Sequence, residues 1–205
     1  MFKRVFLFAL CSGMVPISCY CPDIDAYHAE IQEFSVDPKV NFMKTWPAVV
    51  DIDSDTLSFS LSVSKSEIVD NSLLHSFSLT NSAYADECPS DYIQGWVNKV
   101  DSILIKSDTI FNGIPAGEII NSKFVGYKWR HFPNGHPEIY TTIKPAIDNF
   151  NNYDESSGYA NFWIPITILM TDLPSVNSSH IFTFSFYSKG KLINTVSSPE
   201  ISFQQ

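Results

Sequence analysis

The sequence predicts an all-β fold: an antiparallel β-sandwich, immunoglobulin-like or similar, with short helical turns in its loops. Three observations predict it. Apolar and hydroxyl side chains alternate strictly in several segments, most clearly in LSFSLSV at residues 57–63, which is the pattern of a half-buried strand. Helical periodicity is scarce, and turn-rich segments separate the apolar runs. Many short strands joined by such segments are typical of a sandwich.

Composition limits the size of the domain and its partners. The chain has 205 residues, of which 14% are aromatic and 17% charged, with a formal net charge of −9. The aromatic residues can fill a core, whereas so few charges do not suit the outer faces of long helices or a coiled coil. The acidic balance argues against nucleic acid as a partner, because phosphates require clustered Lys and Arg. The length fits one medium domain.

The first element is a targeting segment. Lys3 and Arg4 precede an apolar stretch that is shorter than the roughly 20 residues needed to span a bilayer, as in a secretory signal. The small residue Ser18 directly precedes Cys19. This arrangement resembles the relaxed lipobox of bacterial lipoproteins, particularly those of Bacteroidetes. The resemblance implies cleavage before Cys19, a diacylglycerol thioether on its sulfur and an acylated amino terminus.

These expectations divide the chain into three parts. We expect residues 1–18 to be a signal peptide, residues 19–27 a lipid-anchored tether and residues 28–205 a single β-sandwich domain. The expected location is the bacterial cell envelope, as an outer-membrane lipoprotein that faces the periplasm or the cell surface. Asp23 and Asp25 resemble the acidic export signal of some Bacteroidetes lipoproteins.

The cysteine count agrees with lipidation. Cleavage removes Cys11 and leaves Cys19, Cys21 and Cys88. An odd number of cysteines in an exported protein needs an explanation, and lipidation of Cys19 leaves an even pair in an oxidising compartment. A Cys21–Cys88 disulfide and two free thiols both remain open, because spacing along the chain does not fix the geometry that a disulfide requires.

The expected strands follow from period-two alternation, with apolar side chains toward the core and serines toward solvent. Phe182, Phe184 and Phe186 share one face of a strand, and the turn SKGK at residues 188–191 joins it to the next strand in a hairpin. Pro165 predicts an edge or strand-start position. The expected strands are residues 29–36, 57–63, 77–79, 103–105, 164–168, 181–187, 192–196 and 201–203.

Three segments have helical features. Residues 93–100 place apolar side chains on one helical face, but Gly95 lies among them, and residues 97–105 fit a strand as well. Residues 116–124 and 142–150 are each expected to supply a short helical turn. Turn residues predict loops at 107–117, 131–137, 149–158 and 171–179.

Short motifs beyond the signal carry a second resemblance. After the lipobox-like cysteine and an early strand come NSAYADECP at residues 81–89, VDSI at 100–103, IF at 110–111, IPAG at 114–117 and PEISF at 199–203. Together they resemble the uncharacterised lipoproteins of about two hundred residues found in Bacteroides and its relatives, a length that matches a single domain. The family has no known activity, so the resemblance implies no catalytic or binding residue.

No motif predicts a metal or a cofactor. Asp51, Asp53 and Asp55 stand at alternate positions, which on an extended segment would project three carboxylates to one side. Oxygen ligands so arranged suit Ca²⁺, although the glycine and bidentate glutamate of an EF-hand are missing. A solvated acidic entry into the following strand is the simpler interpretation.

The chain lacks the standard catalytic motifs, including the nucleophile elbow, the zinc-protease helix, the Walker loop and the Rossmann fingerprint. We therefore expect no enzymatic activity. Aromatic residues near turn-rich segments are the best candidates to stack on a ligand, since sandwich loops often carry recognition. These residues are Tyr127, Trp129, Tyr159 and Trp163. Burial of the same rings in the core is the competing interpretation.

The sequence thus predicts a lipid-anchored envelope protein with a non-enzymatic binding or structural role, and with a glycan or protein as its ligand. An alternative is a surface glycan-binding accessory of a polysaccharide-uptake system, an idea that rests on the aromatic loops and on analogy. A third is an envelope hydrolase, which would require a pocket that holds paired carboxylates or a Ser/His pair.

Overall fold

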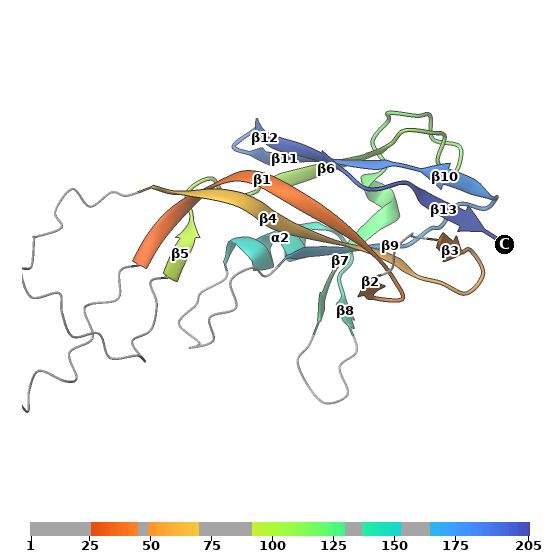
Figure 1. Cartoon of the computed structure of the whole chain (residues 1–205), viewed down its shortest axis with the longest axis horizontal. Coiled ribbons are helices and arrows are strands. Elements are labelled where there is room, and N and C mark those ends of the chain that lie inside the picture. The colour runs from red at the N-terminus through yellow and green to blue at the C-terminus, as the bar shows by residue number, and fades with distance from the viewer. Residues whose placement is uncertain (1–25, 45–48, 70–91, 130–136, 153–164) are drawn as a thin grey trace, which may run out of the picture.

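A computed structural model describes residues 26–44, 49–69, 92–129, 137–152 and 165–205, and it confirms the all-β fold (Figure 1). Strands in this part of the chain form one seven-stranded and two three-stranded sheets. The helical elements described are the 3₁₀ turn η2 (Asn121–Lys123) and the helix α2 (Lys144–Asn151). They overlap the segments 116–124 and 142–150, where short helical turns were expected.

The seven-stranded sheet has the order β2-β1-β4-β9-β7-β8, and β5 runs parallel to the start of β1. Its centre is the long antiparallel pair β1–β4, in which Val40 lies opposite Leu57 and His28 opposite Val69. The strands are β1 (Ala26–Val40), β2 (Met43–Lys44), β4 (Leu57–Val69), β5 (Tyr92–Trp96), β7 (Phe124–Trp129), β8 (Pro137–Ile139) and β9 (Ile166–Met170).

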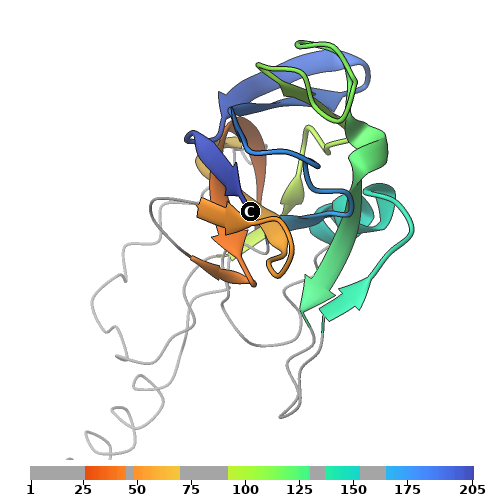
Figure 2. The ribbon, with the colours of Figure 1, turned by 90° about the vertical axis from the view of Figure 1, so that its right-hand side faces the viewer.

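The two smaller sheets share a continuous pair of chain segments. β10 leads into β11 and β12 leads into β13, so one long pair of segments bends from the sheet β12-β11-β6 into the sheet β10-β13-β3. Viewed from the C-terminal end, the strands curl around a common interior (Figure 2). The strands are β3 (Val49–Asp51), β6 (Ser102–Ser107), β10 (Ser178–His180), β11 (Phe182–Ser188), β12 (Lys191–Ser197) and β13 (Ile201–Gln204).

Aromatic rings fill the interior between the sheets. The three phenylalanines of β11 point inward as expected and are fully buried. Phe186 stacks on Phe34 of β1 with ring centroids 3.8 Å apart, and Phe184 lies 5.1 Å from Phe59 of β4. Each such ring removes a large apolar area from water. The contact between β11 and the β1–β4 pair therefore holds the two layers together.

Most strand predictions within the described residues are confirmed. The expected segments overlap β1, β4, β6, β9, β11, β12 and β13, whereas residues 77–79 lie outside the described part. The β11–β12 hairpin closes through Lys189 and Gly190, both at positive φ, as a two-residue hairpin turn requires. Pro165 directly precedes β9, which agrees with the strand-start alternative, whereas the edge alternative is wrong because β9 lies between β4 and β7. The helical alternative for residues 93–100 is also wrong, because β5 occupies their start.

The prediction that the serines of β4 face solvent is wrong for Ser58 and Ser60, which are 1% and 6% exposed. Tyr127 of β7 covers this face and donates a hydrogen bond of 3.4 Å to the Ser58 hydroxyl. Phe42, which follows β1, packs edge-on against Tyr127 at 5.4 Å. Alternation therefore located the strand correctly, while a second layer of aromatic rings determined which face is exposed.

Gly126 in β7 is required by close packing, and we predict that Gly126→Ala destabilises the fold by about 1–3 kcal/mol, the range for overpacking. A Cβ at this position would lie 2.7 Å from the Ala146 Cβ and 3.1 Å from the Thr142 carbonyl oxygen. The backbone here cannot retreat easily, because the Gly126 amide donates to that carbonyl at 2.9 Å. Thermal unfolding by circular dichroism measures the effect. Gly113→Ala, at a positive-φ turn with open space around it, separates packing from backbone strain, and an unchanged Gly126→Ala protein would contradict the packing argument.

Candidate functional site

Most residues that the sequence nominated for anchoring, pairing and stacking lie outside the described residues. These are Cys19, Cys21, Cys88, Tyr159 and Trp163. Trp129 ends β7, but its side chain is outside the described part. Tyr127 is described, and its ring is 4% exposed. Burial raises the pKa of its hydroxyl. The prediction that Tyr127 stacks on a ligand is therefore wrong, because the ring belongs to the covering layer over β4.

The three aspartates do not form an extended row, because residues 52–54 form a turn. The Asp51 carboxylate accepts a 2.9 Å hydrogen bond from the Asp53 amide, and the Asp55 carboxylate accepts one of 2.8 Å from the Asp51 amide. Hydrogen bonds from the Ser54 hydroxyl and then from the Asp53 amide lower the pKa of Asp51. Two of the three carboxylates thus close the turn. Nowhere in the described ranges do three His, Cys, Asp or Glu side chains group as metal ligands.

A different surface emerges from the register of the sheet β10-β13-β3. Ser179 lies opposite Ser202, and Ser202 pairs with Val49. One row further, Gln204 pairs with Asp51. Paired residues on neighbouring strands project to the same side, as do residues two apart on one strand. We define the end face as the outward side of this sheet, with the side chains of Asn177, Ser179, Ser202, Gln204, Val49 and Asp51.

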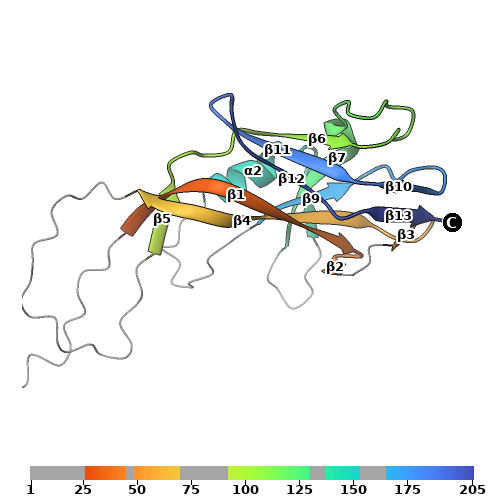
Figure 3. The same cartoon turned by 45° about the horizontal axis from the view of Figure 1, so that its top comes forward.

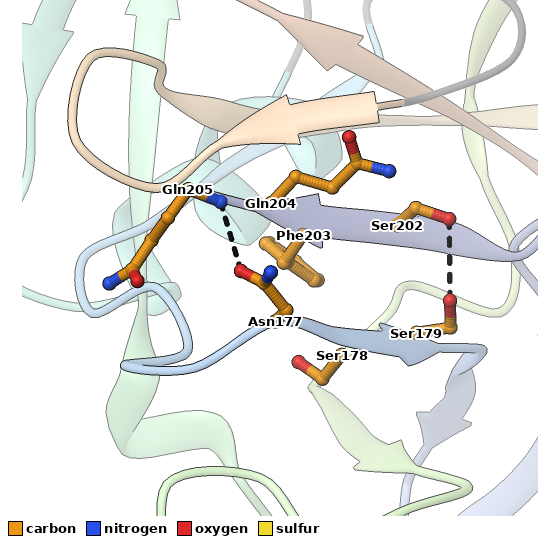
Figure 4. Close-up of a pocket in the computed structure, with 7 residues that line it drawn as sticks. All are labelled: Asn177, Ser178, Ser179, Ser202, Phe203, Gln204 and Gln205. Atoms are coloured by element: carbon orange, nitrogen blue, oxygen red, sulfur yellow. Dashed lines mark hydrogen bonds between the residues drawn. The ribbon is translucent and has the colours of Figure 1, made fainter.

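A shallow recess of about 340 Å³ lies at the β10–β13 part of the end face (Figure 4). Its lining is Asn177, Ser178, Ser179, Ser202, Phe203, Gln204 and Gln205, none of which carries a charged side chain. The Asn177 side-chain oxygen Oδ1 accepts a 2.9 Å hydrogen bond from the Gln205 backbone amide, and the Ser179 and Ser202 hydroxyls are 3.3 Å apart. Among the described residues, the Asn177 Nδ2 and the Gln204 side-chain amide have no hydrogen-bond partner. The recess therefore offers unused donors and acceptors to a ligand.

His180 lies beneath the recess on the inward side of β10 and is 1% exposed. Its Nδ1 is 2.8 Å from both the Ser107 and the Thr109 hydroxyl oxygens, and its Nε2 is 2.9 Å from the Ser178 hydroxyl oxygen. The imidazole stacks on Phe182, with ring centroids 5.8 Å apart. This buried network joins β10, the end of β6 and the loop that follows β6.

Hydrogen-bond directions assign the tautomer of His180. The Ser178 hydroxyl donates to the backbone carbonyl two residues before it at 3.1 Å, and the Thr109 hydroxyl donates to the Ser179 carbonyl at 3.2 Å. Each hydroxyl has one proton, so the Ser178 oxygen accepts from Nε2–H, and Nδ1 of the neutral ring then accepts from the Ser107 hydroxyl. Thr109, whose proton goes to the Ser179 carbonyl, contacts Nδ1 without a hydrogen bond. The Ser178 hydroxyl oxygen therefore accepts a hydrogen bond from the Nε2–H of His180. In a nucleophile–base pair the serine instead donates to the histidine.

Burial is the main cause that lowers the pKa of His180, and the Asp108 carboxylate opposes it. The imidazole is thus held neutral in the folded protein. With Nε2 occupied as a donor and the ring enclosed by phenylalanines, its role is to link strands. We treat the Ser178–His180 contact as structural support for the recess.

Sequence reasoning missed the end face. Residues 171–179 were expected to form a loop, and the three-residue strands β3 and β10 are too short to show alternation. The run SVNSSHIF at residues 175–182 contains four consecutive polar residues, so it shows no alternation that could have located β10.

No protein-family profile, curated protein or solved structure matches this chain. Within the described residues, no helix has the length and apolar character needed to cross a membrane.

Proposed function

We propose that this chain is a lipid-anchored protein of the bacterial cell envelope, one of the uncharacterised Bacteroides-type lipoproteins, with a non-enzymatic binding role at the outer membrane. The placement of the end face carries the proposal. β1 starts at one end of the sandwich, whereas β3, β10, β13 and the C-terminus lie at the other (Figures 1 and 3). Cys19, the proposed lipid attachment site, shortly precedes β1 in the sequence.

The length of β1 sets the separation between the two ends. β1 has 15 residues, and a rise of roughly 3.3 Å per residue gives a strand of about 50 Å. Its last residue, Val40, pairs with Leu57, and a short turn joins Leu57 to Asp51 at the end of β3. The end face is thus built onto the far end of β1. A chain anchored before β1 would present this face away from the lipid, where a ligand can reach it.

One form of this binding role is that of a surface glycan-binding accessory protein in a polysaccharide-uptake system. The uncharged amides and hydroxyls of the recess favour this function. An envelope hydrolase receives less support. The Ser178–His180 contact provides the Ser/His pair that such an enzyme needs, but the serine hydroxyl donates to a backbone carbonyl. The histidine is therefore not placed to take its proton.

Replacing Cys19 with Ala is expected to move the chain from the membrane fraction to the soluble fraction. The proposed lipid is attached through the Cys19 sulfur. Two or more acyl chains make membrane attachment effectively permanent, and without this sulfur the lipid anchor does not form. The measurement is the distribution of the full chain between the soluble and the carbonate-washed membrane fractions of expressing cells. Cys21→Ala is the matched control and should stay in the membrane fraction. Membrane retention of the Cys19→Ala chain would overturn the anchor, and with it the orientation of the end face.

A further inference from the structure

We propose that the recess of the end face is a binding site for a neutral saccharide, an inference that rests on the proposed binding function and names its ligand class. The recess presents donors and acceptors of one chemical kind. Asn177 and Gln204 supply planar amides, and Ser179 and Ser202 supply hydroxyls, all on one side of two paired strands (Figure 4). Sugar hydroxyl groups both donate and accept, so they pair with groups that do the same.

The spacing of these groups lets each of them reach a different hydroxyl of one sugar ring. Adjacent strands lie about 4.8 Å apart, and same-face residues on one strand lie about 6.6 Å apart. The Ser179–Ser202 contact of 3.3 Å uses one of its two hydroxyl protons, so the other remains available. The Asn177 Nδ2 can donate while its oxygen holds the Gln205 amide at 2.9 Å. The strands that carry these side chains are held rigidly, because His180 and Phe203 on their inward side are buried.

The margins of the end face add two further features. Val49, beside Ser202, is 45% exposed and offers an apolar surface for the C–H groups of a sugar ring. Asp51 lies beside Gln204 at the sheet edge and is exposed. Its carboxylate, which accepts the Asp53 amide within the turn, repels anionic ligands.

Charge decides between saccharide classes. The lining of the recess contains no cation to pair with a sulfate, phosphate or uronate group, and such groups are held chiefly by Arg and Lys. The formal net charge of −9 adds a general repulsion of anions. A neutral sugar meets neither obstacle. An extended apolar ligand is disfavoured, since the aromatic side chain of the recess, Phe203, is 1% exposed.

The test measures binding of the full chain, purified from membranes in detergent, to immobilised neutral oligosaccharides (glucan, mannan and galactan) and to an acidic oligogalacturonate. We expect binding to at least one neutral probe and none to the acidic one. Ser179→Arg fills the recess and should weaken that binding by at least about tenfold. Gln204→Ala, a small change at an exposed side chain, should weaken it in the same direction. Ser197→Arg, on the exposed face of β12, is the matched control and should leave the affinity within about twofold.

Each outcome is decisive once circular dichroism shows that the variants are folded. Neutral-probe binding that is lost in Ser179→Arg and kept in Ser197→Arg supports the site. Binding that survives Ser179→Arg and Gln204→Ala overturns the recess as the site and leaves the proposed binding function standing. Binding to the acidic probe alone, or to no probe, overturns the ligand class. The anchor itself is tested separately by fractionation of Cys19→Ala, so the two failures are distinguishable.

Discussion

Replacing Phe182 with Ala is expected to lower the free energy of unfolding by about 3–5 kcal/mol, the range for truncating a core phenylalanine. The ring is fully buried where the three sheets meet. Its centroid lies 5.6 Å from that of Phe59 in β4, 6.1 Å from Phe124 in β7 and 6.5 Å from Phe203 in β13. Because these rings are fixed in separate strands, they cannot all move inward to fill the space, and a cavity remains.

Urea denaturation of the purified chain measures this loss. Thr183→Ala at the next position is the matched control, since its hydroxyl only meets Ser197 at 3.1 Å on the outer side of the sheet. It should cost no more than about 1 kcal/mol. Phe182→Leu keeps part of the volume and should fall between the two. Equal destabilisation by Phe182→Ala and Thr183→Ala would contradict the central position of Phe182 in the core.

The fold was predictable where the alternation of apolar and polar side chains along a strand reflects which side chains are buried. β11 shows this most clearly, because its three phenylalanines face the interior and the residues between and after them are Thr183, Ser185 and Tyr187. The hairpin turn was also visible, since a Lys-Gly pair between two such strands suits a turn with positive φ. These features depend on neighbouring residues alone.

What the sequence did not reveal depends on distant contacts. β7 was missed because Gly126 interrupts its apolar pattern, and the reason for the glycine is the approach of Ala146 on α2. Ser58 was placed toward solvent because nothing local shows that Tyr127 covers it. In both cases a residue far along the chain determines what the position requires.

The recess was beyond prediction for the same physical reason. Its shape depends on β13 pairing with β3 in parallel register, which joins Ser202 to Val49 across most of the chain. The candidates that sequence reasoning favoured were aromatic, and the one whose ring is described, Tyr127, is buried. Large aromatic rings are buried in the core more often than they are exposed at a binding site. Small polar residues at the end of a sheet leave little recognisable pattern in the sequence.

Replacing His180 with Ala is expected to cost about 2–5 kcal/mol at neutral pH. The change leaves a cavity beside Phe182 and removes a hydrogen-bond partner from the hydroxyl groups of Ser107 and Ser178. Loss of ring volume in a core and unpaired buried polar groups both destabilise. The measurement is the urea denaturation midpoint at pH 7.5. His28→Ala at an exposed position is the control and should change the free energy of unfolding by no more than about 0.5 kcal/mol.

The same variant tests the protonation state of His180. Burial lowers its pKa in the folded chain, whereas the ordinary value of about 6.5 applies to the unfolded chain. Between these two values the unfolded chain binds more protons, so the stabilisation is complete above about pH 6.5 and is lost as the pH falls toward the folded pKa. One proton limits the slope to about 1.4 kcal/mol per pH unit. The difference in unfolding free energy between the native chain and His180→Ala should therefore shrink from pH 7.5 to pH 5. A difference that stays constant or grows would show that the buried imidazole is not held neutral.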